Sequence, residues 1–174
     1  REHKVETPAY PMIFLKPPSA LISNGESIRI PPQSQQVEHE AELAVVIGKP
    51  GKWIEPVDVS NHILGYTIAN DVTARDLQYK DGQWTRAKGF DTFCPLGPWI
   101  ETEIDPSDLM ITCRVNGELR QMSSTKEMIF PINQLVSYIS TIMTLKAGDV
   151  ILTGTPAGVD RLESGDVVEI SIEG

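Results

Sequence analysis

Apolar residues fall into short runs along the chain, and glycine or proline bounds most of these runs. Leu43–Ile47 is a continuous apolar run that stops at Gly48, which is typical of a strand buried on both faces. Ile63–Ala69 has the same character, and Ser27–Ile30 is predicted to be a short strand that ends at two prolines. The 13 Gly and 13 Pro residues are spread over the chain rather than clustered, which favours a β-rich architecture.

Two further segments carry stronger local signals. Asn116-Gly117 lies between alternating residues of Ile111–Gln121, and this pair predicts a β-hairpin with a type I′ turn. A helix with Pro131 in its first turn is predicted where apolar residues recur every three or four positions. These residues are Ile132, Leu135, Val136, Ile139, Ile142 and Met143.

Weaker signals complete the pattern. A short helix is expected near Pro56, and the C-terminal part returns to strands at Asp149–Leu152 and Asp166–Ile172. The sequence shows no repeat, no low-complexity tract and no linker, so we expect one domain over residues 1–174. The predicted fold class is mixed α+β with strands dominating.

Composition and charge narrow the classes of function. The formal net charge is −9 and no basic run occurs, which argues against a nucleic-acid partner. No stretch approaches the roughly 18 apolar residues that span a bilayer, so we expect a soluble protein without a membrane partner. Two cysteines give no disulfide framework, which favours the cytoplasm. The chain opens at Arg1 without an initiator Met and ends at Gly174, so we expect both ends to be incomplete.

Candidate chemistry begins with two glutamates beside the apolar run at 43–47. Glu40 and Glu42 lie two positions apart, so in a strand they point the same way, roughly 7 Å apart, and His39 faces away. Carboxylates that are buried this close together need a compensating positive charge, and oxygen ligands suit Mg²⁺, Mn²⁺ or Ca²⁺. The alternative, equally consistent with the spacing, is that Glu38, Glu40 and Glu42 form the solvated face of an edge strand.

Three more segments add polar groups near predicted strand ends. Asp71 could supply a third carboxylate, whereas Arg75 and Asp76 are expected to pair with each other and fix the turn. Lys88 could approach a metal-bound anion, or it could be a solvated surface charge. The turn at 152–158 could bind a carboxylate through its hydroxyls and N–H groups, or it could be a simple β-turn.

Five motifs stand in the order and spacing of a known family. They are HEAELAVVIG at 39–48, GYTIANDVTARDLQ at 65–78, RAKGFDTFCPLGPWI at 86–100, VNGELRQ at 115–121 and ILTGTPAGV at 151–159. On these motifs the chain resembles the fumarylacetoacetate hydrolase family over nearly its whole length. It is most similar to the short members, which comprise 2-hydroxyhepta-2,4-diene-1,7-dioate isomerases, acylpyruvases, fumarylpyruvate hydrolases and oxaloacetate decarboxylases.

The resemblance implies a mixed β-sandwich roll with few helices, a homodimer, and a Mg²⁺ or Mn²⁺ cofactor. By the family pattern, the metal ligands are Glu40, Glu42 and Asp71, and Lys88 is a catalytic residue beside the metal. Substrate contacts carry over to Gln78 and Thr155.

The family's catalytic His and Glu form an HxxE pattern, which His3 and Glu6 match in spacing. The stretch between Glu6 and Pro11–Pro17 is shorter here than is usual in the family. Either the loop is short, or residues are missing after His3, in which case His3 remains the catalytic candidate and Glu6 is a chance match.

The resemblance predicts a metal-dependent enzyme that acts on a small 2-oxo acid through a stabilised enolate. The leading expectation is hydrolysis of a C–C bond in an acylpyruvate or fumarylpyruvate. The alternatives are 2-hydroxyhepta-2,4-diene-1,7-dioate isomerisation and oxaloacetate decarboxylation. A more remote alternative is a non-catalytic binding protein that retains the fold.

Overall fold

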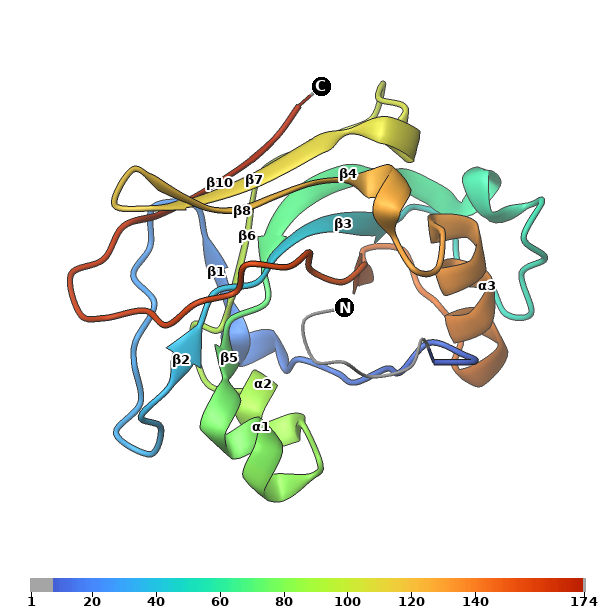
Figure 1. Cartoon of the computed structure of the whole chain (residues 1–174). Coiled ribbons are helices and arrows are strands. Elements are labelled where there is room, and N and C mark those ends of the chain that lie inside the picture. The colour runs from blue at the N-terminus through green and yellow to red at the C-terminus, as the bar shows by residue number, and fades with distance from the viewer. Residues whose placement is uncertain (1–7, 174) are drawn as a thin grey trace.

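The computed structural model describes residues 8–173 (Figure 1). Its strands are β1 (Leu21–Ser23), β2 (Val37–Glu38), β3 (Ala41–Ile47), β4 (Ile63–Asn70), β5 (Thr73–Ala74), β6 (Cys94–Glu101), β7 (Met110–Val115), β8 (Glu118–Ser124), β9 (Val150–Leu152) and β10 (Val168–Ile172). Its α-helices are α1 (Arg75–Asp81), α2 (Thr85–Lys88) and α3 (Ile132–Ile142). Short 3-10 helices are η1 (Pro18–Ala20), η2 (Val59–His62), η3 (Pro106–Asp108) and η4 (Thr125–Glu127).

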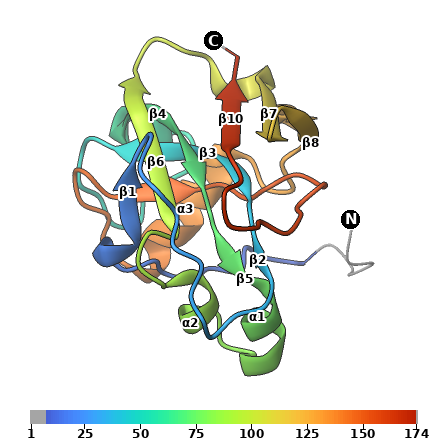
Figure 2. The same ribbon diagram turned by 90° about the vertical axis from the view of Figure 1, so that its left-hand side faces the viewer.

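The largest sheet has the strand order β1-β6-β4-β3-β9, and all its pairs are antiparallel except β1 with β6. Strand β3 lies between β4 and β9, and every residue of β3 is buried, as its continuous apolar run predicts. A separate sheet of order β10-β7-β8 packs against it through β7 on β3 and β10 on β4 (Figure 2). Strands β2 and β5 form a third, two-stranded pair.

The main apolar core gathers at the end of β3 where α3 packs. It consists of Val45, Ile47, Ile54, Val59, Val136, Leu145 and Ile151. At the opposite end of β3, helices α1 and α2 lie below the sheet beside β5 (Figure 1). None of the helices formed by residues 8–173 has the length and apolar character needed to cross a membrane.

Several predicted elements are confirmed. The hairpin forms between β7 and β8, and Asn116 and Gly117 both have positive φ (53° and 81°), as a type I′ turn requires. The periodic helix is α3, with Pro131 at its N-cap, and strands β9 and β10 lie within the predicted C-terminal ranges. The helix expected near Pro56 is the single 3-10 turn η2.

The predicted strand at Ser27–Ile30 is wrong, because this segment has no regular secondary structure. The backbone N–H of Arg29 donates to Thr92 Oγ1 at 2.8 Å rather than to a neighbouring strand. The two prolines that follow offer no N–H for a ladder, so nothing extends the pairing. The strand-dominated α+β class is nevertheless confirmed.

Candidate metal centre

Three buried carboxylates meet where β3 begins and β4 ends. Glu40 directly precedes β3, Glu42 lies within it, and Asp71 directly follows β4. The antiparallel register brings them together, because Asp71 N–H donates to the Glu40 carbonyl at 2.9 Å. Each of the three offers an oxygen within 4.8 Å of the others, and their exposed fractions are 6%, 3% and 1%. The solvated edge-strand alternative is therefore wrong.

Lys88 is a buried cation between two of these carboxylates. It ends the short helix α2, and its Nζ donates to Glu40 Oε2 at 2.8 Å and to Asp71 Oδ2 at 2.6 Å. The ammonium also lies over the ring of Phe14, 4.9 Å from its centroid. Burial alone would lower the pKa of Lys88, but Asp71 and Glu40 outweigh it and raise this pKa. The alternative of a solvated surface charge is wrong for this lysine.

Arg75 compensates a second pair of carboxylates. Its Nε donates to Glu38 Oε2 at 2.7 Å, and its Nη2 donates to Glu40 Oε1. Its Nη1 donates to Gln78 Oε1 at 2.5 Å, which fixes the amide of the predicted substrate contact beside the cluster.

The predicted pair between Arg75 and Asp76 is wrong. Asp76 instead accepts from Ser34 Oγ at 2.6 Å and from Gln35 N–H at 2.9 Å. The physical reason is that consecutive residues of helix α1 point in different directions, so Arg75 faces the cluster while Asp76 faces the 34–35 loop.

Sequence reasoning missed Lys16 as a member of this cluster. Its Nζ donates to Asp71 Oδ1 at 2.6 Å and to the Val72 carbonyl at 3.3 Å, and its side chain is 9% exposed. Asp71 therefore carries a lysine on each carboxylate oxygen. The only sequence signal was the position of Lys16 within the Pro11–Pro17 stretch, which shares no local pattern with the acidic residues.

Glu42 differs from the other carboxylates of the cluster. Within residues 8–173 no cationic side chain forms an ion pair with it, and Gly154 N–H donates to its Oε2 at 2.6 Å. Burial, followed by repulsion from Asp71 and Glu40, raises the pKa of Glu42 well above its usual range. Among the described residues, four carboxyl groups thus face three cationic side chains, and Glu42 is the one without a cationic partner.

The remaining predicted residues lie around this cluster or outside the described range. Thr155 lies in the turn after β9, where its hydroxyl donates to the Ala41 carbonyl at 2.9 Å. His39 faces the other way, as expected, and its Nδ1 lies 2.9 Å from Gln121 Oε1. His3 and Glu6 lie outside the described residues.

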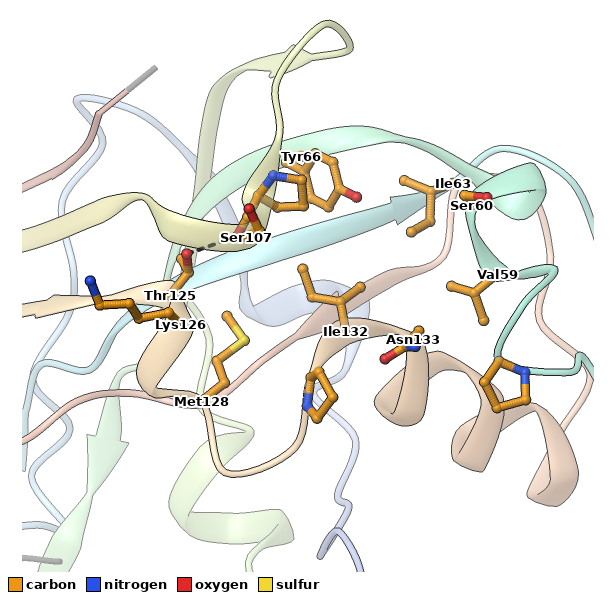
Figure 3. A pocket seen from close by; sticks show the side chains of 13 residues that line it. Val59, Ser60, Ile63, Tyr66, Ser107, Thr125, Lys126, Met128, Ile132 and Asn133 are labelled. Atoms are coloured by element: carbon orange, nitrogen blue, oxygen red, sulfur yellow. Dashed lines mark hydrogen bonds between the residues drawn. The ribbon is translucent and has the colours of Figure 1, made fainter.

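A cavity of about 470 Å³ lies at the other end of β4, between η2, η4 and the start of α3 (Figure 3). Its walls include Ile63, Tyr66, Met128 and Ile132. Tyr66 precedes Asp71 by five positions, which places the cavity roughly 16 Å along the strand from the acidic cluster. Within the described part of the chain, no carboxylate lines this cavity. The cavity and the acidic cluster are therefore separate features.

The sequence matches the family described as fumarylacetoacetate (FAA) hydrolase, C-terminal, over residues 1–174. An uncharacterized protein of Methanocaldococcus jannaschii is 59% identical over 174 residues, which are 100% of this chain and 73% of that protein. A mitochondrial oxaloacetate tautomerase of Bos taurus is 48% identical over 185 residues, covering 99% of this chain and 59% of the relative. The chain thus spans only part of the length of these relatives.

Solved structures give the same result. The crystal structure of 2-hydroxyhepta-2,4-diene-1,7-dioate isomerase from Mycobacterium marinum matches with a TM-score of 0.95 and 54% sequence identity. The match covers 97% of this chain and 67% of that chain. Sequence and fold agree, and the chain belongs to the fumarylacetoacetate hydrolase family.

Proposed function

We propose that this chain is a divalent-cation-dependent enzyme that moves a proton on a small 2-oxo acid, as an isomerase or keto–enol tautomerase. The observation that carries the proposal is the buried carboxyl group of Glu42, which has no cationic partner within residues 8–173, whereas Glu40 and Asp71 beside it have two each. Relatives named as an oxaloacetate tautomerase and a dienedioate isomerase support proton transfer over hydrolysis, the leading expectation from the sequence.

The donor set fits Mg²⁺ or Mn²⁺. Glu40, Glu42 and Asp71 offer three carboxylate oxygens at one point, and hard cations prefer such ligands. A divalent ion held there would act as a Lewis acid and lower the cost of forming an enolate. The cluster would then change from a net negative to a net positive charge, which suits an anionic 2-oxo acid.

The chain's own cations complete the proposed site. Lys16 and Lys88 donate to the two oxygens of the Asp71 carboxylate and compensate its charge. Lys88 also supplies positive charge where negative charge would develop on the substrate. Gln78, held by Arg75, and Thr155 would contact the substrate's oxygens.

We assign the proton transfer to His3, with Glu6 as its partner if the HxxE match holds. An imidazole has the pKa that general acid–base catalysis near neutral pH requires. Hydrolysis of an acylpyruvate is the second candidate, because it uses the same enolate and the family is named for a hydrolase. A homodimer in the cytoplasm remains the expectation for its assembly and location.

The test follows the enol form of oxaloacetate with added Mg²⁺ or Mn²⁺. We expect Glu42→Gln, and EDTA with the wild type, to lower the rate at least about 100-fold, because Lewis-acid stabilisation contributes several kcal/mol. Met128→Ala in the remote cavity serves as the control and should keep the wild-type rate. A wild-type rate that persists in EDTA, or in Glu42→Gln with added metal, would refute the metal proposal, and a loss in Met128→Ala would place the chemistry in the cavity.

The same assay separates the two candidate activities. Acetylpyruvate and fumarylpyruvate are offered in parallel, and pyruvate release is measured. Pyruvate release that exceeds oxaloacetate tautomerisation in rate would replace the proposed isomerase by the hydrolase.

A further inference from the structure

Gln121 is a fully buried amide that nothing in the proposed chemistry uses. It lies in β8, on the sheet that packs against β3, and ends the motif at 115–121. Its Oε1 lies 2.9 Å from His39 Nδ1 and accepts from Ala41 N–H at 3.1 Å. Its Nε2 donates to Thr155 Oγ1 and to the Pro156 carbonyl, both at 2.8 Å. The hydrogen-bonding capacity of this amide is therefore filled.

These bonds lie at the start of β3, beyond the point where β9 stops pairing with it. The ladder between β9 and β3 ends with Leu152 opposite Ala44. Thr153 N–H still donates to the Leu43 carbonyl at 3.2 Å, and the chain then leaves the sheet. It returns at Arg161, which bridges to Glu38. Between these points the backbone N–H and carbonyl of Ala41 bond to Gln121 and Thr155 instead of a strand. Two side chains thus satisfy the backbone of the residue that separates Glu40 from Glu42.

The direction of each bond follows from the chemistry of the amide. An amide oxygen only accepts, so His39 Nδ1 carries the proton that it donates to Gln121. An amide nitrogen only donates, so the Thr155 hydroxyl accepts from Gln121 and gives its own hydrogen to the Ala41 carbonyl. The donor and acceptor of each hydrogen bond are consequently fixed by the orientation of the Gln121 amide.

The detour of the chain brings a donor to Glu42. Gly154 has a φ of +100°, a conformation that L side chains rarely adopt, and its N–H points at Glu42 Oε2. Gly158, with a φ of +101°, passes so close to the Arg120 carbonyl that an added Cβ would clash with it. The turn at 153–158 is therefore held against β8 at the position of Gln121.

We propose that Gln121 is a positioning residue for this site. Its amide takes the place of a missing strand along β3 and holds the 153–158 turn where Gly154 donates to Glu42 and Thr155 donates to the Ala41 carbonyl. The importance of this position for catalysis rests on the proposed function, whereas the effect on the turn does not.

The experiment compares Gln121→Met, Thr155→Val and Ser140→Ala with the wild type. Gln121→Met keeps the length of the side chain and removes every bond. Thr155→Val removes the two bonds of the Thr155 hydroxyl, to Gln121 and to the Ala41 carbonyl, and keeps the bond from Gln121 to the Pro156 carbonyl. The half-buried position of Thr155 makes this the safer variant for folding. Ser140 is as fully buried as Gln121. Its hydroxyl accepts from Ile54 N–H and donates to the Ser137 carbonyl, and neither residue lies in the turn, so Ser140→Ala is the matched control.

Two measurements are made on each protein, hydrogen exchange of the Gly154 amide by NMR without metal, and Mn²⁺ affinity by calorimetry. We expect Gln121→Met and Thr155→Val to speed Gly154 exchange and weaken Mn²⁺ binding by about tenfold, the loss typical of one hydrogen bond to a charged group. Ser140→Ala should lower the melting temperature while both measurements stay within about twofold of wild type.

The outcomes separate this inference from the proposed function. Unchanged Gly154 exchange in both site variants would overturn the positioning role, whatever the metal does. Equal changes in Ser140→Ala would also overturn it, because the effect would then follow general stability. Faster exchange in the two site variants, combined with no Mn²⁺ binding by the wild type, would support the role of Gln121 and refute the proposed function.

Discussion

At its C-terminal end, strand β3 packs Val45 and Ile47 against Val136 and Leu145, and at its N-terminal end it carries Glu42 among other charged groups. Both ends are equally buried. Each buried aliphatic side chain at the first end contributes about 1.5–3 kcal/mol to stability. Removing an ion from water costs several kcal/mol, which only paired charges offset. One end of the strand therefore stabilises the fold, while the other holds a costly arrangement that is suited to binding a cation.

The largest effect on this comparison should come from breaking the charge compensation. Arg75→Met leaves Glu38 and Glu40 buried without their guanidinium, and we expect the free energy of unfolding to fall by about 3–5 kcal/mol. Urea unfolding in EDTA measures it. Arg86→Met, which removes an exposed pair with Asp81, should change stability little. Similar losses in the two variants would show that burial of the pair does not matter.

A cavity at the apolar end should lower stability without touching the metal. Ile47→Ala removes a fully buried side chain from the main core, so we expect a loss of about 2–4 kcal/mol. The Mn²⁺ affinity measured by calorimetry should remain within about twofold of wild type, because none of the proposed metal ligands lies in this core. Metal affinity that fell in step with stability would contradict the division of β3 into two functional ends.

The fold was predictable where a local sequence pattern is characteristic of one element. The apolar run of β3, the Asn116-Gly117 turn and the stripe of α3 are such cases. Strand β6 was not predicted, because it contains two prolines and a glycine, which argue against a strand. Helix α1 was not predicted either, because its buried face includes Arg75 and Gln78 and therefore lacks an apolar stripe.

The candidate site was likewise predictable only where a local sequence pattern marks it. Two carboxylates entering an apolar strand indicate a compensating cation, and the structure gathers Glu40 and Glu42 with Asp71. Long-range partners leave no such trace. Lys16 reaches Asp71 across 55 positions, and Gln121 reaches Ala41 across 80, so only the packing of separate elements shows that Lys16 belongs to the cluster and that Gln121 supports the backbone between its glutamates.

The smallest expected effect concerns the ionisation of two buried thiols, Cys94 in β6 and Cys113 in β7, which lie in different sheets. Burial raises the pKa of Cys94 to about 11, with Lys16 opposing and Asp71 and Glu42 adding to the rise, and burial alone raises the pKa of Cys113 to about 12. In an unfolded chain the pKa of a cysteine thiol is 9.0, so both thiols stay protonated to a higher pH in the native state. The resulting stabilisation is complete below about pH 9 and declines as pH rises toward 11 for Cys94 and 12 for Cys113.

Iodoacetamide labelling followed by mass spectrometry checks this order. At pH 8 we expect both native thiols to react far more slowly than in urea-unfolded protein, because the thiolate is the reactive form and both side chains are buried. As the pH is raised, Cys94 should react before Cys113, since its pKa is lower. The reverse order would show that access to the packed face of β7, rather than thiol ionisation near the charged cluster, controls reactivity, and it would weaken the electrostatic contrast between the two regions.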